Sequence, residues 1–143
     1  MIVDDKIINY VLYQMRTENE VRKKCNSLKF EEDYIDEAIE YLKEAGYIDD
    51  KKYAKKYVEN VIRLKHISAN EIKIALMRKG VNQDIIDDAV DTEEVYTFEE
   101  ESCIINAEKK YKSCGDVLKV RKFLVSKGYK YEIINDVLEK YGE

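Results

Sequence analysis

The side chains of this chain best suited to chemistry are carboxylates spaced for one face of a helix: Asp84, Asp87, Asp88 and Asp91. Such a stripe could hold a hard cation through its oxygens or act in acid–base chemistry. However, the segment lacks the Asp-x-Asp-x-Asp-Gly loop of a calcium site, and no nucleophile or oxyanion donor accompanies it. We therefore interpret the stripe as a solvated helix face, and we expect no catalytic residue, no metal and no other cofactor. The protein is not expected to be an enzyme.

The cysteines and the single histidine give no sign of a metal or redox centre. Cys25, Cys103 and Cys114 are odd in number and form no C-x-x-C pair, which suits thiols buried in a reducing compartment. Residues 1–5 show no basic region followed by an apolar run, and no segment reaches the roughly 18 apolar residues of a membrane span. These features predict a cytoplasmic protein that does not enter a membrane, and we expect it to be a monomer.

Basic side chains recur in a second pattern, which we call the basic rib: Arg22, Lys23, Lys73, Arg78, Lys79, Arg121, Lys122 and Lys127. The formal net charge of the chain is −5, so any attraction to an acidic partner must be local and oriented. Two interpretations remain open. The rib docks on an acidic protein surface or on phosphate, or its members only form exposed ion pairs with neighbouring acidic helices, each worth little.

A threefold sequence repeat must position these side chains. Asn19 and Asn70 lie 51 residues apart in matching segments, and Ile72 and Val120 lie 48 apart. Apolar residues at helical spacing define three helices in each copy, and no segment alternates as a half-buried strand would. A unit this small cannot bury its apolar face alone, so the copies must stack. The sequence predicts an all-α fold: three tandem three-helix repeats, at 1–46, 47–95 and 96–143, stacked into an elongated, curved array of helices that cross at right angles.

Glycines and capping residues mark the ends of the predicted helices. Gly80 and Gly128 follow the second helices, where a left-handed residue ends a helix at little cost, and Lys29 stands at the same place in the first copy. Thr17 and Ser68 open capping boxes. In the third copy, a Thr97-x-x-Glu pattern predicts that the first helix runs from there to about residue 113.

The turn between the first two copies is expected to have a structural role. Gly46 should end the third helix in a left-handed conformation, and Tyr47 should be buried at the joint between the copies. Asp49 or Asp50 should then cap the next helix.

The same turn carries a resemblance to a known family. Residues 46–58, which begin Gly46-Tyr47-Ile48-Asp49-Asp50, resemble the central motif of the RecX family, and residues 16–24, 76–81 and 123–129 resemble its flanking motifs. This resemblance implies three tandem three-helix repeats and a non-enzymatic regulator of the RecA recombinase. Members bind RecA and lie along the groove of its filament on single-stranded DNA. They restrain filament growth, ATPase, strand exchange and coprotease activity.

Two other functions are compatible with an all-helical repeat. Each second helix, glycine and third helix superficially resembles a helix-turn-helix DNA-binding unit. In that geometry the third helix would bring the Asp84 stripe towards phosphate, which disfavours duplex binding and leaves only weak affinity for DNA. A generic helical adaptor is the other alternative.

Overall fold

Helices form wherever the sequence shows apolar residues at helical spacing. The computed structural model describes residues 1–142, and within that range the chain contains nine α-helices and no strand. The helices are α1 (Asp5–Tyr13), α2 (Glu18–Ser27), α3 (Glu32–Glu44), α4 (Asp50–Leu64), α5 (Ala69–Arg78), α6 (Gln83–Val90), α7 (Glu93–Cys114), α8 (Val117–Ser126) and α9 (Tyr131–Leu138), followed by a 3₁₀ turn, η1 (Glu139–Tyr141). The all-α prediction is confirmed. In the same range, no helix is both long and apolar enough to span a bilayer.

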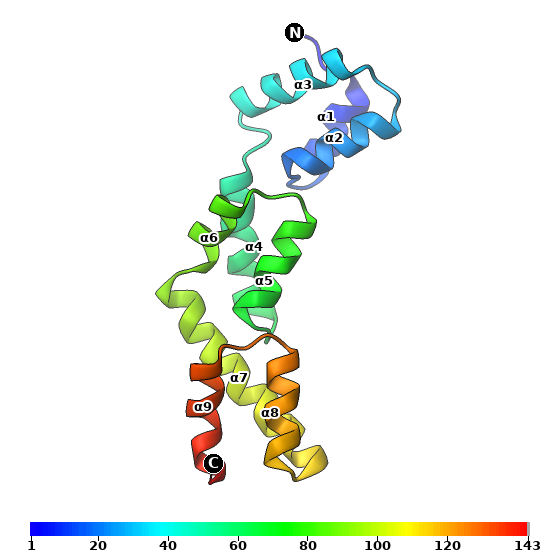
Figure 1. Cartoon of the computed structure of the whole chain (residues 1–143). Coiled ribbons are helices and arrows are strands. Elements are labelled where there is room, and N and C mark those ends of the chain that lie inside the picture. The colour runs from blue at the N-terminus through cyan, green and yellow to red at the C-terminus, as the bar shows by residue number, and fades with distance from the viewer. Residues whose placement is uncertain (143) are drawn as a thin grey trace.

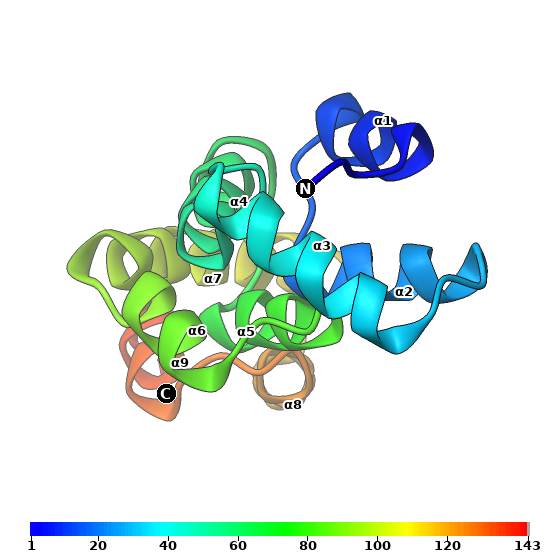
Figure 2. The same ribbon diagram turned by 90° about the horizontal axis from the view of Figure 1, so that it is seen from above.

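The helices form three consecutive groups along an elongated, curved molecule (Figure 1). Helices α1–α3 lie at the N-terminal end, α4–α6 in the middle and α7–α9 at the C-terminal end. Seen from above, α4 and α8 lie on opposite sides of the molecule, and α7 crosses between them (Figure 2). Each group has its own apolar cluster. The clusters follow the three groups of helices, although Ile48 packs in the first cluster and Phe98 in the middle one, and the units 1–46, 47–95 and 96–143 stay a prediction.

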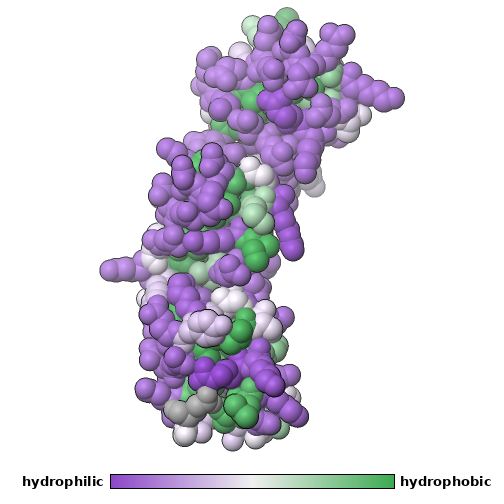
Figure 3. Space-filling view, in the orientation of Figure 1, coloured by the Kyte–Doolittle hydropathy of each residue, from purple (hydrophilic) through white to green (hydrophobic). Residues whose placement is uncertain are grey.

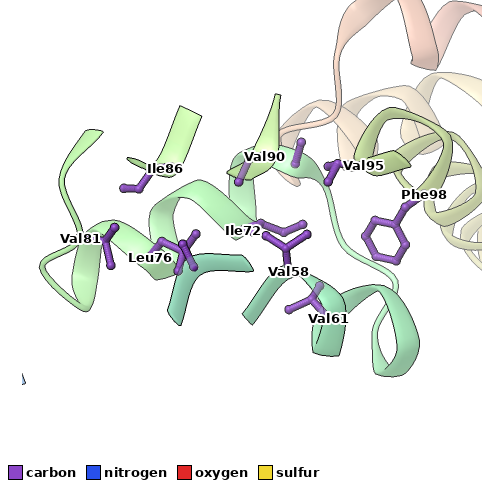
Figure 4. Packing of buried hydrophobic residues seen from close by; sticks show 11 residues of the cluster. Val58, Val61, Ile72, Leu76, Val81, Ile86, Val90, Val95 and Phe98 are labelled. Carbon is purple, nitrogen blue, oxygen red and sulfur yellow. The ribbon is translucent and has the colours of Figure 1, made fainter. Parts of the chain in front are cut away.

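The middle cluster illustrates why each unit needs three helices. Ile72 and Leu76 of α5 are fully buried, one helical turn apart. Val58 of α4 and Ile86 of α6 pack around them (Figure 4). Each helix contributes only one apolar stripe, so none of them could bury it alone. Phe98, from the next helix in the chain, also packs in this cluster and ties it to the third group.

Helix α7 differs from the prediction at its start. It begins at Glu93 rather than at Thr97, and the Thr92 hydroxyl accepts a hydrogen bond from the Val95 backbone N–H at 3.2 Å. The physical reason is burial: Val95 and Phe98 are 1% and 6% exposed in the middle cluster, so the first turn is stabilised by the preceding unit. The Thr97 pattern therefore lies inside the helix.

The turn after α3 is as predicted at Gly46 but not at Tyr47. Gly46 has a φ of +83°, which is left-handed, and Asp49 caps α4 by accepting from the Lys52 N–H at 3.1 Å. The prediction that Tyr47 is buried is wrong, because its side chain is 45% exposed, whereas Ile48 is 3% exposed. After the left-handed turn, Ile48 is the residue that enters the first apolar cluster.

Candidate partner-binding surface

The second helices of the three groups, α2, α5 and α8, lie end to end along the molecule (Figure 1). At the first joint, the Thr17 hydroxyl at the start of α2 donates to the Lys79 carbonyl oxygen at the end of α5, at 2.8 Å. At the second joint, the Ser68 hydroxyl donates to the Lys127 carbonyl oxygen at 2.7 Å. Both hydroxyl-bearing side chains are fully buried. The basic rib therefore lies on one column of helices, and the joints of that column are equivalent.

Glycine follows the lysine at each joint for two reasons. Gly80 and Gly128 have φ values of +82° and +86°, as the sequence predicted. In addition, a β-carbon at Gly80 would overlap the Asn19 side chain, and one at Gly128 would lie 2.9 Å from the amide nitrogen of Asn70. Lys29, at the equivalent place in the first unit, also has a positive φ of 64°. The close approach at the joints was not predicted from the sequence.

One cation of the rib in each unit binds the third helix of the same unit. The closest nitrogen–oxygen distances are 2.9 Å for Arg22–Asp36, 3.2 Å for Lys73–Asp87 and 2.9 Å for Arg121–Asn135. These pairs occupy equivalent positions of the repeat. Three of the eight rib cations are therefore bound within their own units.

Lys73 binds two carboxylates of the acidic stripe, Asp87 and Asp91. Its ammonium lies 2.9 Å from Asp91 as well as beside Asp87. A hydrogen bond to Asp91 raises the pKa of Lys73, and hydrogen bonds from Gln83 and Lys73 lower the pKa of Asp87. Within residues 1–142 there is no group of three His, Cys, Asp or Glu side chains placed to hold a metal ion.

The other five rib cations are exposed: Lys23, Arg78, Lys79, Lys122 and Lys127. The Lys79 ammonium lies 3.5 Å from Glu20 across the first joint, and that of Lys127 lies 5.5 Å from the ring centroid of Phe123. Among residues 1–142, Lys23, Arg78 and Lys122 have no ion-pair partner. The exposed members are therefore the part of the rib that remains available to another molecule.

Basic side chains are concentrated on the second helices and acidic side chains on the third helices. Helix α8 contains three cations and no carboxylate, and α5 contains two cations and one carboxylate. Helix α6 contains three carboxylates and no cation, and α3 contains six carboxylates and one cation. A partner with a negative surface would be attracted to the column and repelled by the third helices.

The first joint has a second link, made by Asp50. Its carboxylate accepts a hydrogen bond from the Glu18 backbone N–H at 2.9 Å, so it satisfies one of the free amides at the start of α2. Burial is the main reason that the pKa of Asp50 is raised. A groove of about 590 Å³ lies beside this contact, with Lys43 and Ile48 among its lining residues. Asp49 and Asp50 thus have different roles: one caps α4 and the other joins two units.

Sequence reasoning missed a buried polar group at the second joint. Glu99 on α7 is fully buried and forms an ion pair with Lys130, and Ser102 on the same helix is also buried. Near them, the side-chain amide of Asn106 donates to the Tyr129 hydroxyl at 2.7 Å. The repeat did not predict this contact: Glu99 stands 49 residues after Asp50, but it binds Lys130 of its own unit, whereas Asp50 binds the Glu18 amide of the preceding unit.

Sequence reasoning also missed the exposed apolar side chains on the column. Met77, Leu118 and Val125 are 57%, 66% and 38% exposed. Apolar side chains reach the surface along the α5–α8 side of the molecule (Figure 3). A signal for them was present in the sequence. Each of these residues lies off the buried stripe of its helix, which on α8 consists of Val120 and Leu124.

Comparisons with known proteins agree with this architecture. Residues 49–90 match the family model described as RecX, second three-helix domain, a region that covers α4–α6. The chain is 40% identical over 137 residues to the regulatory protein RecX of Clostridium botulinum, covering 88% of this chain and 62% of that protein. It is also 40% identical over 136 residues to the regulatory protein RecX of Clostridium perfringens, covering 87% and 61%.

A solved structure extends the similarity to the fold of nearly the whole chain. The crystal structure of RecX from Lactobacillus salivarius superposes with a TM-score of 0.85 at 32% sequence identity, covering 95% of this chain and 92% of that one. The sequence motifs, the repeated joints and these similarities agree. The chain belongs to the RecX family.

Proposed function

We propose that this protein regulates the RecA recombinase by binding RecA, in particular its filament on single-stranded DNA, and restraining its activity. Membership of the RecX family is the observation that carries the proposal. The protein would act in the cytoplasm as a monomer in recombination and DNA repair, including the SOS response, and would perform no chemistry of its own.

The shape and charge of the molecule support this proposal. Each second helix has ten residues, about 15 Å at the helical rise, and three of them follow one another along the column. A surface of that length can touch more than one subunit of a helical partner. The exposed rib cations would provide the attraction: Lys23, Arg78, Lys79, Lys122 and Lys127.

Sequence-specific binding to duplex DNA is a weaker proposal. A helix-turn-helix reader inserts its second helix into the major groove, and here that helix would be the third of each unit. Helix α6 is acidic, and its Asp87 is already bound to Lys73. We therefore expect weak binding to free DNA and tighter binding to the RecA–DNA filament.

Titration of the protein into RecA hydrolysing ATP on single-stranded DNA tests the proposal. We expect hydrolysis to fall as the protein is added, at concentrations that leave free single-stranded DNA mostly unbound. ATP hydrolysis that is unchanged at saturating protein would contradict the regulatory role. Inhibition that appears only when the DNA itself becomes coated would indicate competition for DNA instead.

A further inference from the structure

The outward sides of α5 and α8 combine apolar and basic side chains. Leu118, Lys122 and Val125 stand at spacings of four and three residues, so they share one side of α8. Met77 and Arg78 occupy the corresponding side at the end of α5, because Met77 and Val125 are equivalent positions of the repeat. We call these five residues the α5–α8 face.

Both parts of this face point away from the rest of the protein. All five residues are exposed, and Met77 and Val125 lie about 100° around their helices from the buried residues Leu76 and Leu124. The two helices lie one after the other on the same side of the molecule in both views (Figures 1 and 2). Their continuity is fixed by the Ser68–Lys127 hydrogen bond. The face is therefore elongated: Val125 lies near this joint, and Met77 and Arg78 lie about 13 Å further along the column, at the far end of α5.

The composition of the face distinguishes between two kinds of partner. Phosphate is bound by cations and backbone amides, and exposed Leu or Met adds nothing to that contact. Single-stranded bases stack on aromatic rings, and the five residues include none. Protein interfaces, by contrast, place apolar side chains, Met among them, beside arginine. The face carries two cations, Arg78 and Lys122, and α8 contains no carboxylate. The face therefore complements a negative surface.

We propose that the α5–α8 face binds an acidic protein surface that presents apolar side chains, on the protein subunits of the filament rather than on its DNA. This inference rests on the proposed function and assigns the contact to one face of the molecule. Met77 and Leu118 supply buried apolar contact, while Arg78 and Lys122 orient the two surfaces.

The test compares two double variants that each remove two exposed apolar side chains. Met77→Gln with Leu118→Gln alters the face, whereas Leu12→Gln with Leu64→Gln alters side chains that are 60% and 70% exposed on α1 and α4. Binding to fluorescent single-stranded DNA is measured with and without RecA, and circular dichroism checks the fold of each variant. We expect at least about tenfold weaker filament binding for the face variant only, with unchanged binding to free DNA.

Three outcomes would overturn the inference. Filament binding could be unchanged in the face variant, both variants could weaken it equally, or binding to free DNA could fall in parallel, which would assign the face to nucleic acid. If the wild-type protein does not bind the filament, the proposed function is wrong, and so is the contact assigned to the α5–α8 face. If the wild type binds and the face variant binds equally well, only the inference fails.

Discussion

The Thr17 hydroxyl donates a hydrogen bond to the carbonyl oxygen of Lys79, 62 residues away, at 2.8 Å. The same hydroxyl accepts from the Glu20 backbone N–H at 3.1 Å, so one buried group satisfies the ends of two helices from different units. Ser68 repeats both bonds at the next joint. Asp116 stands at the equivalent position in the third unit and caps α8, but an ionised carboxylate has no proton to donate in this way.

Loss of this hydroxyl should weaken the joint. We expect Thr17→Val to lower the free energy of unfolding by about 1–3 kcal/mol, because a helix cap is lost and the Lys79 carbonyl loses its partner. Thr97→Val, at an exposed position of α7, is the control and should change it by less than about 0.5 kcal/mol. Urea unfolding measures both variants. Equal stability of the two variants would show that the joint does not depend on this bond.

The close approach at Gly80 can be separated from its backbone conformation. Gly46→Ala and Gly80→Ala both place a side chain at a left-handed φ, of +83° and +82°, which costs about 1–2 kcal/mol. Only at Gly80 would the added carbon meet another side chain, that of Asn19. Gly80→Ala should therefore be the less stable variant in thermal unfolding. The contact would be unimportant if both variants unfold at the same temperature.

In the turn after α3, two neighbouring residues are expected to differ in how much their truncation to alanine lowers stability. Ile48→Ala should cost about 2–5 kcal/mol, because the side chain is 3% exposed and lies in the first cluster. Tyr47→Ala should cost less than about 1 kcal/mol, because that side chain is 45% exposed. Chemical unfolding of the two variants checks the assignment. A larger loss from Tyr47→Ala would place the tyrosine in the core after all.

The repeat makes most of the fold predictable, but not the contacts between units. Apolar spacing located the helices, because each stripe must be buried against neighbours in its own unit. Tyr47 was misplaced because Tyr47 and Ile48 are both apolar enough for the joint, and only the direction of the chain after Gly46 decides between them. The early start of α7 could not be predicted either, since it depends on packing of Phe98 against the preceding unit.

The same limit applies to the candidate surface. Composition identified the basic rib, but it did not show that Lys73 faces Asp87 while Arg78 faces outward. That difference is set by the rotation of each helix against its neighbours. The sequence therefore predicted which helices carry charge, and the structure separates the internal pairs from the exposed members.

Cys103 should be unreactive and should make stability depend on alkaline pH. Burial is the main cause that raises the pKa of its thiol to about 12, from an ordinary value of 9.0. The unfolded thiol ionises near pH 9 while the folded one stays neutral, so the unfolded state binds fewer protons and stability falls as pH rises between these values.

Two measurements check this prediction. In the folded protein, a thiol reagent at pH 8 should modify the half-buried Cys114 well before Cys103. Between pH 9 and pH 10, unfolding of Cys103→Ala should lose less stability with pH than the wild type does. Rapid labelling of Cys103 in the folded state, or identical pH slopes, would contradict the prediction.

The most direct test of the account is the affinity for RecA–single-stranded DNA filaments of two triple charge reversals. One variant carries Arg78→Glu, Lys122→Glu and Lys127→Glu on the column. The matched control carries Lys51→Glu, Lys55→Glu and Lys56→Glu on α4, which lies on the side of the molecule away from α8 (Figure 2). We expect filament affinity to fall about tenfold or more for the column variant, with little change for the control. Equal affinities of the two variants would contradict the proposal that the exposed rib binds the filament.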